Sequence, residues 1–255
     1  MRRHELTDEE WAIIQPLLPN KVRGVPRVDD RRVINGIVWR FRTGAPWRDV
    51  PERYGPRTTL YNRFVRWRKA GVWDRILDAV SEAYDGDIVM IDSSCVRVHQ
   101  HGAGGKKGDS EAAGDGRMGR SRGGLTTKIH ALVDAEGRPV RLLLTAGQAN
   151  DAPACEQLLP LVAKDAILIA DRAYDTNAIR ATVTERGAWA NIPPRAIRKG
   201  SFPFSSWLYR QRNLVERFFN RIKHFRGLAT RYDRSPDNFL AALKLAAIRI
   251  WLAAK

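Results

Sequence analysis

The sequence contains very little cysteine: Cys95 and Cys155 are the two in 255 residues. Neither belongs to a CxxC or His-rich pair, so the spacing excludes a disulfide framework and disfavours a structural zinc site. No apolar run approaches the roughly 18 residues of a membrane span, and the first ten residues hold no apolar signal core. No GxxxxGK[ST] pattern occurs, so ATP binding is not indicated. We therefore expect an intracellular, cytoplasmic protein that makes no membrane contact.

Acidic residues are also scarce relative to basic ones. Asp and Glu number 28 against 44 Lys and Arg, which gives a net charge of +16. Such an excess indicates a polyanionic partner, and nucleic acid is the first choice. The alternative is a basic but otherwise ordinary soluble protein. Hydrophobic residues make up 44% of the chain, which excludes a disordered chain and allows a packed core.

The first 85 residues show helical periodicity. Capping residues and apolar stripes predict helices that start near Thr7 and Asp29 and others over residues 58–69 and 73–83. Basic residues crowd the helix over 58–69 outside its apolar face: Arg57, Arg63, Arg66, Arg68 and Lys69. A helix, a Gly/Pro turn and a basic helix are compatible with a helix-turn-helix motif. The alternative is a helical bundle with a solvated basic face. We predict a DNA-binding domain over residues 1–85, with these contacts to DNA: Arg57, Arg63 and Arg66.

Strand and helix patterns alternate over residues 86–255. The predicted strands cover residues 87–91, 125–133, 139–144, 166–170 and 189–192, and the predicted helices cover 151–162, 176–186, 206–225 and 236–252. This order predicts an α/β (mixed) domain, in which a mixed sheet is covered by helices.

Two of these strands are short apolar runs that lead into an aspartate. Asp92 follows one run and Asp171 follows the other. Continuous apolar runs are typical of strands buried on both faces. If the two strands are parallel neighbours, the carboxylates converge, and like charges in proximity either share a proton or bind a cation. Magnesium prefers carboxylate oxygens and keeps positions open for water and phosphate. The simpler alternative is that each aspartate caps a following helix.

The helix over residues 206–225 supplies a third acid. At about 100° per residue, Tyr209, Arg212, Glu216 and Lys223 fall within roughly 60° of one another, beside an apolar arc. Three carboxylates suffice to hold two metal ions at a phosphodiester, where Arg212 and Lys223 would contact phosphates. Tyr209 would stack on a base, bond a phosphate or pack. The alternative is an amphipathic helix with an ordinary i,i+4 ion pair.

A Gly-rich segment, two histidines and four tryptophans each have a functional and a structural interpretation. The Gly-rich segment 102–124 predicts a loop, and its basic residues are candidates for phosphate contacts, with a solvated loop as the alternative: Lys106, Lys107, Arg117, Arg120 and Arg122. His99 and His101 have HxH spacing, but they lack a third ligand nearby, so a loop role is favoured over metal binding. Four tryptophans are interpreted as packing residues: Trp39, Trp47, Trp67 and Trp73.

Together, Tyr209, Arg212, Glu216 and Lys223 reproduce the Y-x2-R-x3-E-x6-K signature of bacterial insertion-sequence transposases of the DDE class. The chain most resembles the insertion-sequence-five group, and the resemblance covers nearly its whole length. Further similar segments are Thr43–Pro51, Arg63–Trp67, Ile91–Ser93, Asp171–Tyr174 and Thr230–Asp233.

The resemblance implies an RNase H-like catalytic domain over residues 86–255, with Asp92, Asp171 and Glu216 as catalytic and metal-binding acids. It implies Mg²⁺ or Mn²⁺, two ions, as cofactor, and cutting and joining of DNA strands without ATP. The implied partners are double-stranded DNA, as terminal inverted repeats and target, and further copies of the chain on paired ends. Such an enzyme would be associated with the bacterial nucleoid. Two rival functions are a nuclease of the same fold that does not join ends and a catalytically inactive DNA-binding regulator.

Overall fold

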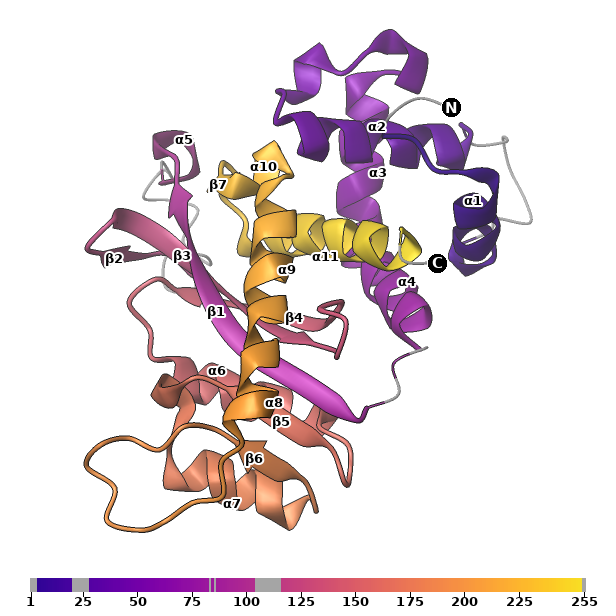
Figure 1. Cartoon of the computed structure of the whole chain (residues 1–255). Coiled ribbons are helices and arrows are strands. Elements are labelled where there is room, and N and C mark those ends of the chain that lie inside the picture. The colour runs from indigo at the N-terminus through magenta and orange to yellow at the C-terminus, as the bar shows by residue number, and fades with distance from the viewer. Residues whose placement is uncertain (1–3, 20–27, 83, 85, 104–115, 254–255) are drawn as a thin grey trace. The chain divides into compact units, whose positions relative to one another are not determined.

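The structure is a computed structural model that describes residues 4–19, 28–82, 84, 86–103 and 116–253. The chain forms two compact units (Figure 1). The helical unit comprises residues 1–82, 99–105 and 222–255, and the sheet unit comprises residues 83–98 and 106–221. Within the described ranges, no helix is both long and apolar enough to span a membrane.

A single mixed sheet forms the centre of the sheet unit. Its strands are β1 (Ile88–Val98), β2 (Gly119–Ser121), β3 (Gly124–Val133), β4 (Pro139–Ala146), β5 (Ile167–Ala170) and β6 (Trp189–Asn191). β3 lies antiparallel between β1 and β4, and it also pairs with the short β2. On the other side of β1, β5 and β6 are parallel to it and to each other. This β4-β3-β1-β5-β6 order, with these directions, is that of the predicted RNase H-like sheet.

The strand predictions agree with the structure within a few residues except at β1, and the short β2 lies within the segment 102–124 that was predicted to be a loop. The apolar run predicted to end before Asp92 continues as strand to Val98, because antiparallel pairing with β3 extends from Met90 to Arg97. Parallel pairing with β5 covers only Ile88 to Ile91. Asp92 therefore lies in the middle of a strand, at the position where one of its two neighbours ends.

Two helices complete the core of the sheet unit. The helix α6 (Asp151–Leu158) begins at an Asn150 cap, and α7 (Asn177–Glu185) begins at a Thr176 cap. Their apolar side chains form a fully buried cluster with the centre of the sheet: Val89, Ile91, Leu132, Cys155, Leu158, Leu168, Ile179 and Val183 are among its members. Burial of apolar surface on this scale is the main favourable contribution to folding. The core thus fixes the strands that carry the aspartates.

The helix predicted over residues 206–225 is interrupted. It consists of α8 (Ser206–Tyr209), a 3₁₀ turn over Arg210–Arg212 and α9 (Asn213–Lys223). A 3₁₀ turn has three residues per turn and so changes the phase of the residues before it relative to those after it. Tyr209 and Glu216 are therefore not related by a uniform helical phase as predicted.

In the helical unit the predicted helices are present. They are α1 (Asp8–Ile14), α2 (Asp30–Thr43), α3 (Arg57–Lys69), α4 (Val72–Ser81) and α11 (Pro236–Leu252). Short elements join them: 3₁₀ turns over Gln15–Leu17, Trp47–Asp49 and Glu52–Tyr54, α5 (Gln100–Ala103), α10 (Arg226–Ala229) and β7 (Thr230–Arg231). Thr7 and Glu10 form a capping box at the start of α1, and Asp29 caps α2, as their sequence positions suggested.

The C-terminal segment belongs to the helical unit, which the predicted division at residue 85 did not foresee. Nearly every apolar side chain of α11 is buried. Its Lys244 pairs with Asp74 of α4, and its Arg249 pairs with Glu10 of α1. A helix that is apolar on most of its surface requires surrounding partners, and the N-terminal helices provide them.

A buried aspartate ties together three segments of the sheet unit. The Asp175 carboxylate accepts hydrogen bonds from the Arg180 Nε at 2.7 Å, the Arg195 amide at 2.7 Å and the Arg198 Nε at 2.9 Å. Burial alone would raise the pKa of Asp175, but the hydrogen bonds from Arg198, Arg195 and Arg180 outweigh it and lower the pKa to about 2. The residue therefore anchors the chain after β6 to the start of α7.

We predict that Asp175→Asn lowers the free energy of unfolding by about 3–5 kcal/mol, because two buried guanidinium groups lose their charge partner. Since the folded pKa is depressed below an unfolded value of about 3.9, the stabilisation is complete above about pH 5 and is lost as the pH falls toward 2. Urea unfolding at several pH values measures both effects. The control is Asp165→Asn, at an exposed turn position with φ 63° that asparagine tolerates. Equal stability of the two variants at pH 7 would contradict the prediction.

Candidate active site

The ends of two parallel strands bring Asp92 and Asp171 together. In the β1–β5 ladder Ile91 pairs with Ala170, so the next residue on each strand is an aspartate. Neighbouring strands lie about 4.8 Å apart, which places the two carboxylates side by side. The register confirms that the two strands are parallel neighbours, which is the condition on which the predicted convergence of the carboxylates depends.

Arg212 joins the third acid to the first. Its Nη2 donates to Asp92 Oδ2 at 2.7 Å, and its Nη1 donates to Glu216 Oε1 at 2.7 Å. The 3₁₀ turn that carries Arg212 and the adjoining start of α9 therefore lie against β1 (Figure 1). The Asp92 side chain is 13% exposed and that of Glu216 is 57% exposed. The Asp92 carboxylate thus lies at the edge of the core, and the Glu216 carboxylate lies in solvent.

The electrostatics of the site identify which groups face one another. Burial raises the pKa of Asp92 to about 6, and the charges of Asp171 and Glu216 raise it too, while Arg212 and the Ser93 amide oppose the change. Burial also raises the pKa of Tyr209, and Asp171 and Asp92 add to that rise. Tyr209 therefore lies near both aspartates. Among the predicted groups, the structure brings together four around Asp92: Asp171, Tyr209, Arg212 and Glu216.

Both of the simpler alternatives are also present. Asp171 caps the 3₁₀ turn over Arg172–Tyr174 and accepts the Ala173 amide at 2.7 Å. Arg212 and Glu216 form the i,i+4 ion pair. Neither interaction uses all the lone pairs of the carboxylate concerned, since each oxygen can accept more than one bond. These local roles are therefore compatible with a shared acidic site.

The donor set fits a hard divalent cation. Three carboxylates provide the oxygen ligands that magnesium and manganese prefer. As the side chains stand, no three acidic, His or Cys groups in the described ranges converge closely enough to hold an ion. The group that lies between Asp92 and Glu216 is the Arg212 guanidinium, which forms an ion pair with each of them.

A polar network behind β1 was not predicted. Asp151 Oδ1 accepts from Ser93 Oγ at 3.1 Å and from Lys128 Nζ at 2.8 Å, and His130 Nδ1 lies 3.8 Å away. Burial lowers the pKa of His130 to about 4, although Asp151 opposes this, so the ring is neutral at pH 7. Lys128 and His130 are alternate residues of a predicted strand and therefore lie on the same face of the sheet. This alternation of polar residues is the sequence pattern that could have predicted the network. The network fixes the residue next to Asp92.

Three of the predicted DNA contacts of the helical and C-terminal regions are exposed: Arg57, Arg66 and Lys223. Arg63 is not. Its side chain is 9% exposed, pairs with Asp30 of α2 and lies over the Trp67 ring at 5.3 Å. The helical phase places Arg63 on the packed face of α3. Its side chain therefore packs within the helical unit, and its burial argues against the predicted contact with DNA. Lys106 and Lys107 lie outside the described residues.

Aromatic residues of the helical unit behave largely as predicted. Trp67 and Trp73 are buried and meet edge to face, with ring centroids 5.3 Å apart. His99 stacks on Tyr232 with centroids 4.6 Å apart, and the described residues offer no third ligand that would make a metal site with His101. The favoured non-metal role of the two histidines is consistent with this arrangement.

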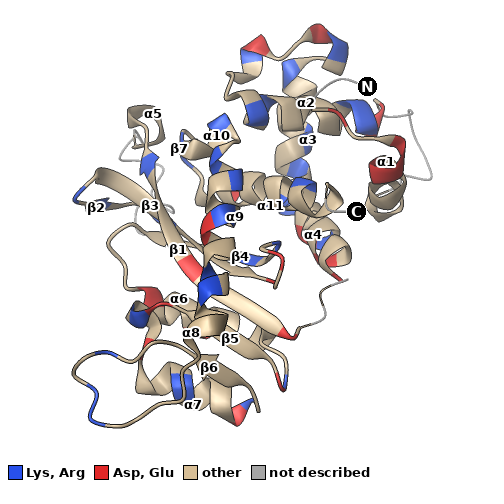
Figure 2. Ribbon diagram, viewed as in Figure 1, with Lys and Arg blue, Asp and Glu red and all other residues tan. Residues whose placement is uncertain are grey.

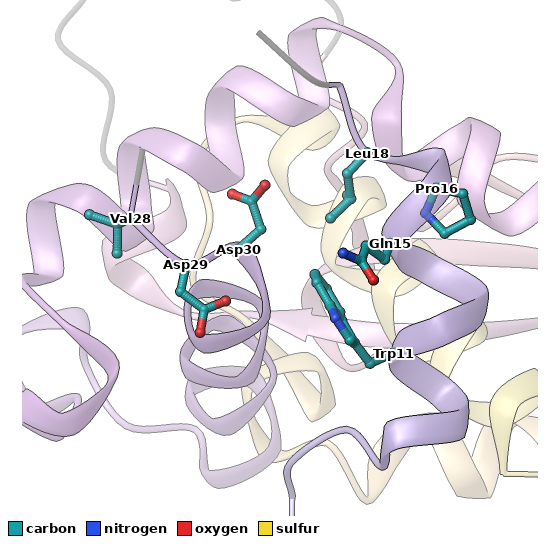
Figure 3. Close-up of a pocket in the computed structure, with 7 residues that line it drawn as sticks. All are labelled: Trp11, Gln15, Pro16, Leu18, Val28, Asp29 and Asp30. Carbon is teal, nitrogen blue, oxygen red and sulfur yellow. The ribbon is translucent and has the colours of Figure 1, made fainter. Parts of the chain in front are cut away.

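A separate hollow of about 590 Å³ lies in the helical unit, between the end of α1 and the start of α2 (Figure 3). Trp11, Gln15 and Leu18 line one side of it, and Asp29 and Asp30 lie on the other. Both acids already have structural roles, because Asp29 caps α2 and Asp30 pairs with Arg63. We therefore do not consider this hollow a candidate catalytic site.

Family models match both regions of the chain. Residues 6–77 match "Putative transposase of IS4/5 family", and residues 83–251 match "Transposase DDE domain". A putative transposase for insertion sequence element IS6501 from Brucella ovis is 38% identical over 130 residues, which are 50% of this chain and 99% of that protein. The uncharacterized protein y4sN from Sinorhizobium fredii is 37% identical over 47% of this chain and 94% of its own.

Solved structures give a weaker likeness. A piggyBac transposase synaptic complex with hairpin DNA has a TM-score of 0.40 and 12% identity, over 74% of this chain and 47% of that one. A Mos1 transposase paired-end complex has a TM-score of 0.29 and 13% identity, over 84% of this chain and 83% of that one. The fold assignment rests on the strand order instead, and the family rests on the match over residues 83–251. The chain belongs to the family of transposases that carry a DDE domain.

Proposed function

We propose that this transposase cuts DNA at the ends of an insertion sequence and joins the freed 3′-hydroxyls to a target, with Asp92, Asp171 and Glu216 as the acidic site. The observation that carries the proposal is the register of β1 and β5, which places Asp92 and Asp171 at matching positions on neighbouring strands, together with Arg212, which links Asp92 to Glu216. Such clustering of like charges at the edge of a core is costly unless a cation compensates it.

The three acids would hold Mg²⁺ or Mn²⁺, two ions in the proposed mechanism. When bound, such ions stabilise charge on the attacking and leaving oxygens of the phosphodiester. The protein's own contribution is to fix the carboxylates: the β1–β5 ladder holds Asp92 and Asp171, and Asp151 holds Ser93 beside them. This rigidity avoids reorganisation during the reaction.

Arg212 and Tyr209 have roles toward the DNA strand. Once a cation compensates Asp92 and Glu216, the Arg212 guanidinium becomes available for a phosphate, whose oxygens match its fork of donors. Tyr209 lies near both aspartates and would contact the same strand. Lys223, exposed and seven residues after Glu216, would contact a phosphate further along.

The helical N-terminal region would bind double-stranded DNA at the terminal inverted repeats. Exposed Arg57, Arg66 and Lys69 lie on α3, whose opposite face is buried through Leu60, Phe64 and other apolar residues. Basic residues are spread over both units (Figure 2). We further propose that more than one copy of the chain acts on paired ends, and that the protein is associated with the nucleoid.

We predict that Asp92→Asn, Asp171→Asn and Glu216→Gln each reduce metal-dependent end cleavage by at least about 10³-fold, because each removes a charge that holds the metal ions. The assay uses a supercoiled plasmid that carries the element's own ends, with Mg²⁺ or Mn²⁺. The control is Glu156→Gln, which removes an exposed acid of the same unit on α6.

The same assay separates the rival functions. Binding of the ends should persist in all four variants. Joined products in the wild type support a transposase, and cleavage without joining supports a nuclease. Specific binding of ends without any metal-dependent cleavage would refute the catalytic proposal and favour a DNA-binding regulator.

We predict that metal affinity weakens as the pH falls through about 6. Burial holds the pKa of Asp92 at about 6 when no metal is bound, so protons compete with the ion below this pH and not above it. For one competing proton the apparent affinity falls up to about tenfold per pH unit. Titration with Mn²⁺ by calorimetry between pH 5 and 8 measures this, and a constant affinity over that interval would contradict it.

We also predict a steep dependence of DNA affinity on salt. Each phosphate that a Lys or Arg neutralises releases counterions, so six or more contacts weaken binding by about 10³-fold or more between 50 and 200 mM salt. Fluorescence anisotropy with labelled end DNA gives the slope. The variant Arg66→Ala should reduce the slope by about 1, whereas Arg63→Ala should act through stability instead. A slope near zero would exclude a phosphate-dominated interface.

A further inference from the structure

Exposed apolar side chains gather in one segment of the sheet unit. Five large hydrophobic residues are exposed in the described ranges, and three of them lie within residues 197–207. These are Ile197 at 84%, Phe204 at 37% and Trp207 at 66% exposure. Single exposed apolar residues are common, but three within residues 197–207, one of them an indole of this exposure, indicate a contact segment.

The same segment is basic in sequence and contains no acid of its own, although Arg198 pairs with Asp175 and Arg212 pairs with Asp92 and Glu216. Between Glu185 and Glu216 the sequence has no Asp or Glu, and its bases are Arg186, Arg195, Arg198, Lys199, Arg210 and Arg212. Figure 2 shows basic and no acidic residues on the loop that leads from β6 to α8. Aromatic rings interleaved with basic residues are typical of surfaces that bind single-stranded nucleic acid. The charge therefore selects a polyanion over an apolar protein partner.

The segment is held in place by its own contacts. Asn191 Nδ2 donates to the Ser205 carbonyl at 3.1 Å, and the Ser205 amide donates to Asn191 Oδ1 at 2.8 Å. Further back, Phe202 lies under the Arg180 and Arg198 guanidinium groups, at 4.4 and 4.8 Å from its ring centroid. Ser205 also caps α8. Phe204 and Trp207 are thus presented from an anchored backbone.

This surface borders the acidic site within the same unit. The Phe204 and Tyr209 rings meet with centroids 5.4 Å apart, and Tyr209 lies near Asp92 and Asp171. Trp207 lies two residues before Tyr209 in α8, an axial rise of about 3 Å and a rotation of about 200°, so the indole leaves the helix on a different side from the Tyr209 ring. In Figure 1 α8 lies beside β5, the strand that leads into Asp171. A strand in the acidic site would lie near Phe204, which contacts Tyr209, and would meet Trp207 where it passes around α8.

We propose that Trp207 stacks on an unpaired base of the DNA strand that extends from the acidic site around α8. The inference rests on the proposed function for the presence of that strand. A base inside a duplex already stacks on its neighbours, so an exposed indole gains most from a base that has left the duplex. Stacking on an aromatic side chain also tolerates any base, because every base has a π-face.

The test measures binding without metal, so it does not depend on cleavage. The full chain is titrated with two DNAs of the same end sequence: a blunt duplex and a duplex with a single-stranded extension that carries 2-aminopurine. The variants are Trp207→Ala, Trp207→Phe and, as a matched control, Ile197→Ala, which removes exposed apolar area without a π-face. Melting temperatures check that each variant folds.

Trp207→Ala should weaken binding of the extended DNA by about tenfold and relieve quenching of the 2-aminopurine, with little change for the blunt duplex. Trp207→Phe should restore most of both signals, and Ile197→Ala should match the wild type. Unchanged binding and quenching in Trp207→Ala would overturn the proposal. An equal loss in Ile197→Ala, or a Trp207-dependent change in oligomeric state without a change in DNA binding, would assign the surface to general apolar contact or to a protein partner.

The outcome is separable from that of the proposed function. Cleavage that fails while Trp207-dependent stacking persists would refute the catalytic proposal alone. Normal cleavage with no effect of Trp207 on either DNA would refute the stacking proposal alone.

Discussion

The parallel pairing of β1 with β5 is the constraint on which the site depends. The two apolar strands are buried on both faces, and their register ends at Ile91 and Ala170. A shift of one residue would turn every side chain of a strand to the opposite face. The hydrophobic core therefore fixes the positions of Asp92 and Asp171 as firmly as it fixes the strands, and their mutual repulsion is offset by packing elsewhere.

That arrangement creates a demand for positive charge, which Arg212 meets in the structure. Its bonds to Asp92 and Glu216 connect β1 with the turn between α8 and α9. The same guanidinium is suited to a phosphate, which is the role that the proposed function assigns to it once a cation compensates the acids. The adjoining segment, with Tyr209 and the exposed Trp207, continues the surface along which a DNA strand would lie.

Much of the local structure follows from the sequence, because it is specified by neighbours in the chain. Apolar runs and alternation predicted β3, β4, β5 and β6, and caps at Thr7 and Asp29 predicted where two helices begin. The prediction failed where long-range contacts decide. β1 continues past Asp92 because β3 pairs with it, and Arg63 is buried because α2 supplies an acid opposite it.

By itself, the sequence determined most element types and the family and named the three candidate acids, since these depend on residue identity and spacing along the chain. Only the tertiary structure decided which side chains meet. It placed Arg212 between two acids, built the Asp151 network behind β1, and put α11 in the helical unit. It also left Trp207 exposed beside the acidic site. The reason is physical: such pairings depend on strand register and helix packing between residues distant in the chain, which local periodicity does not encode.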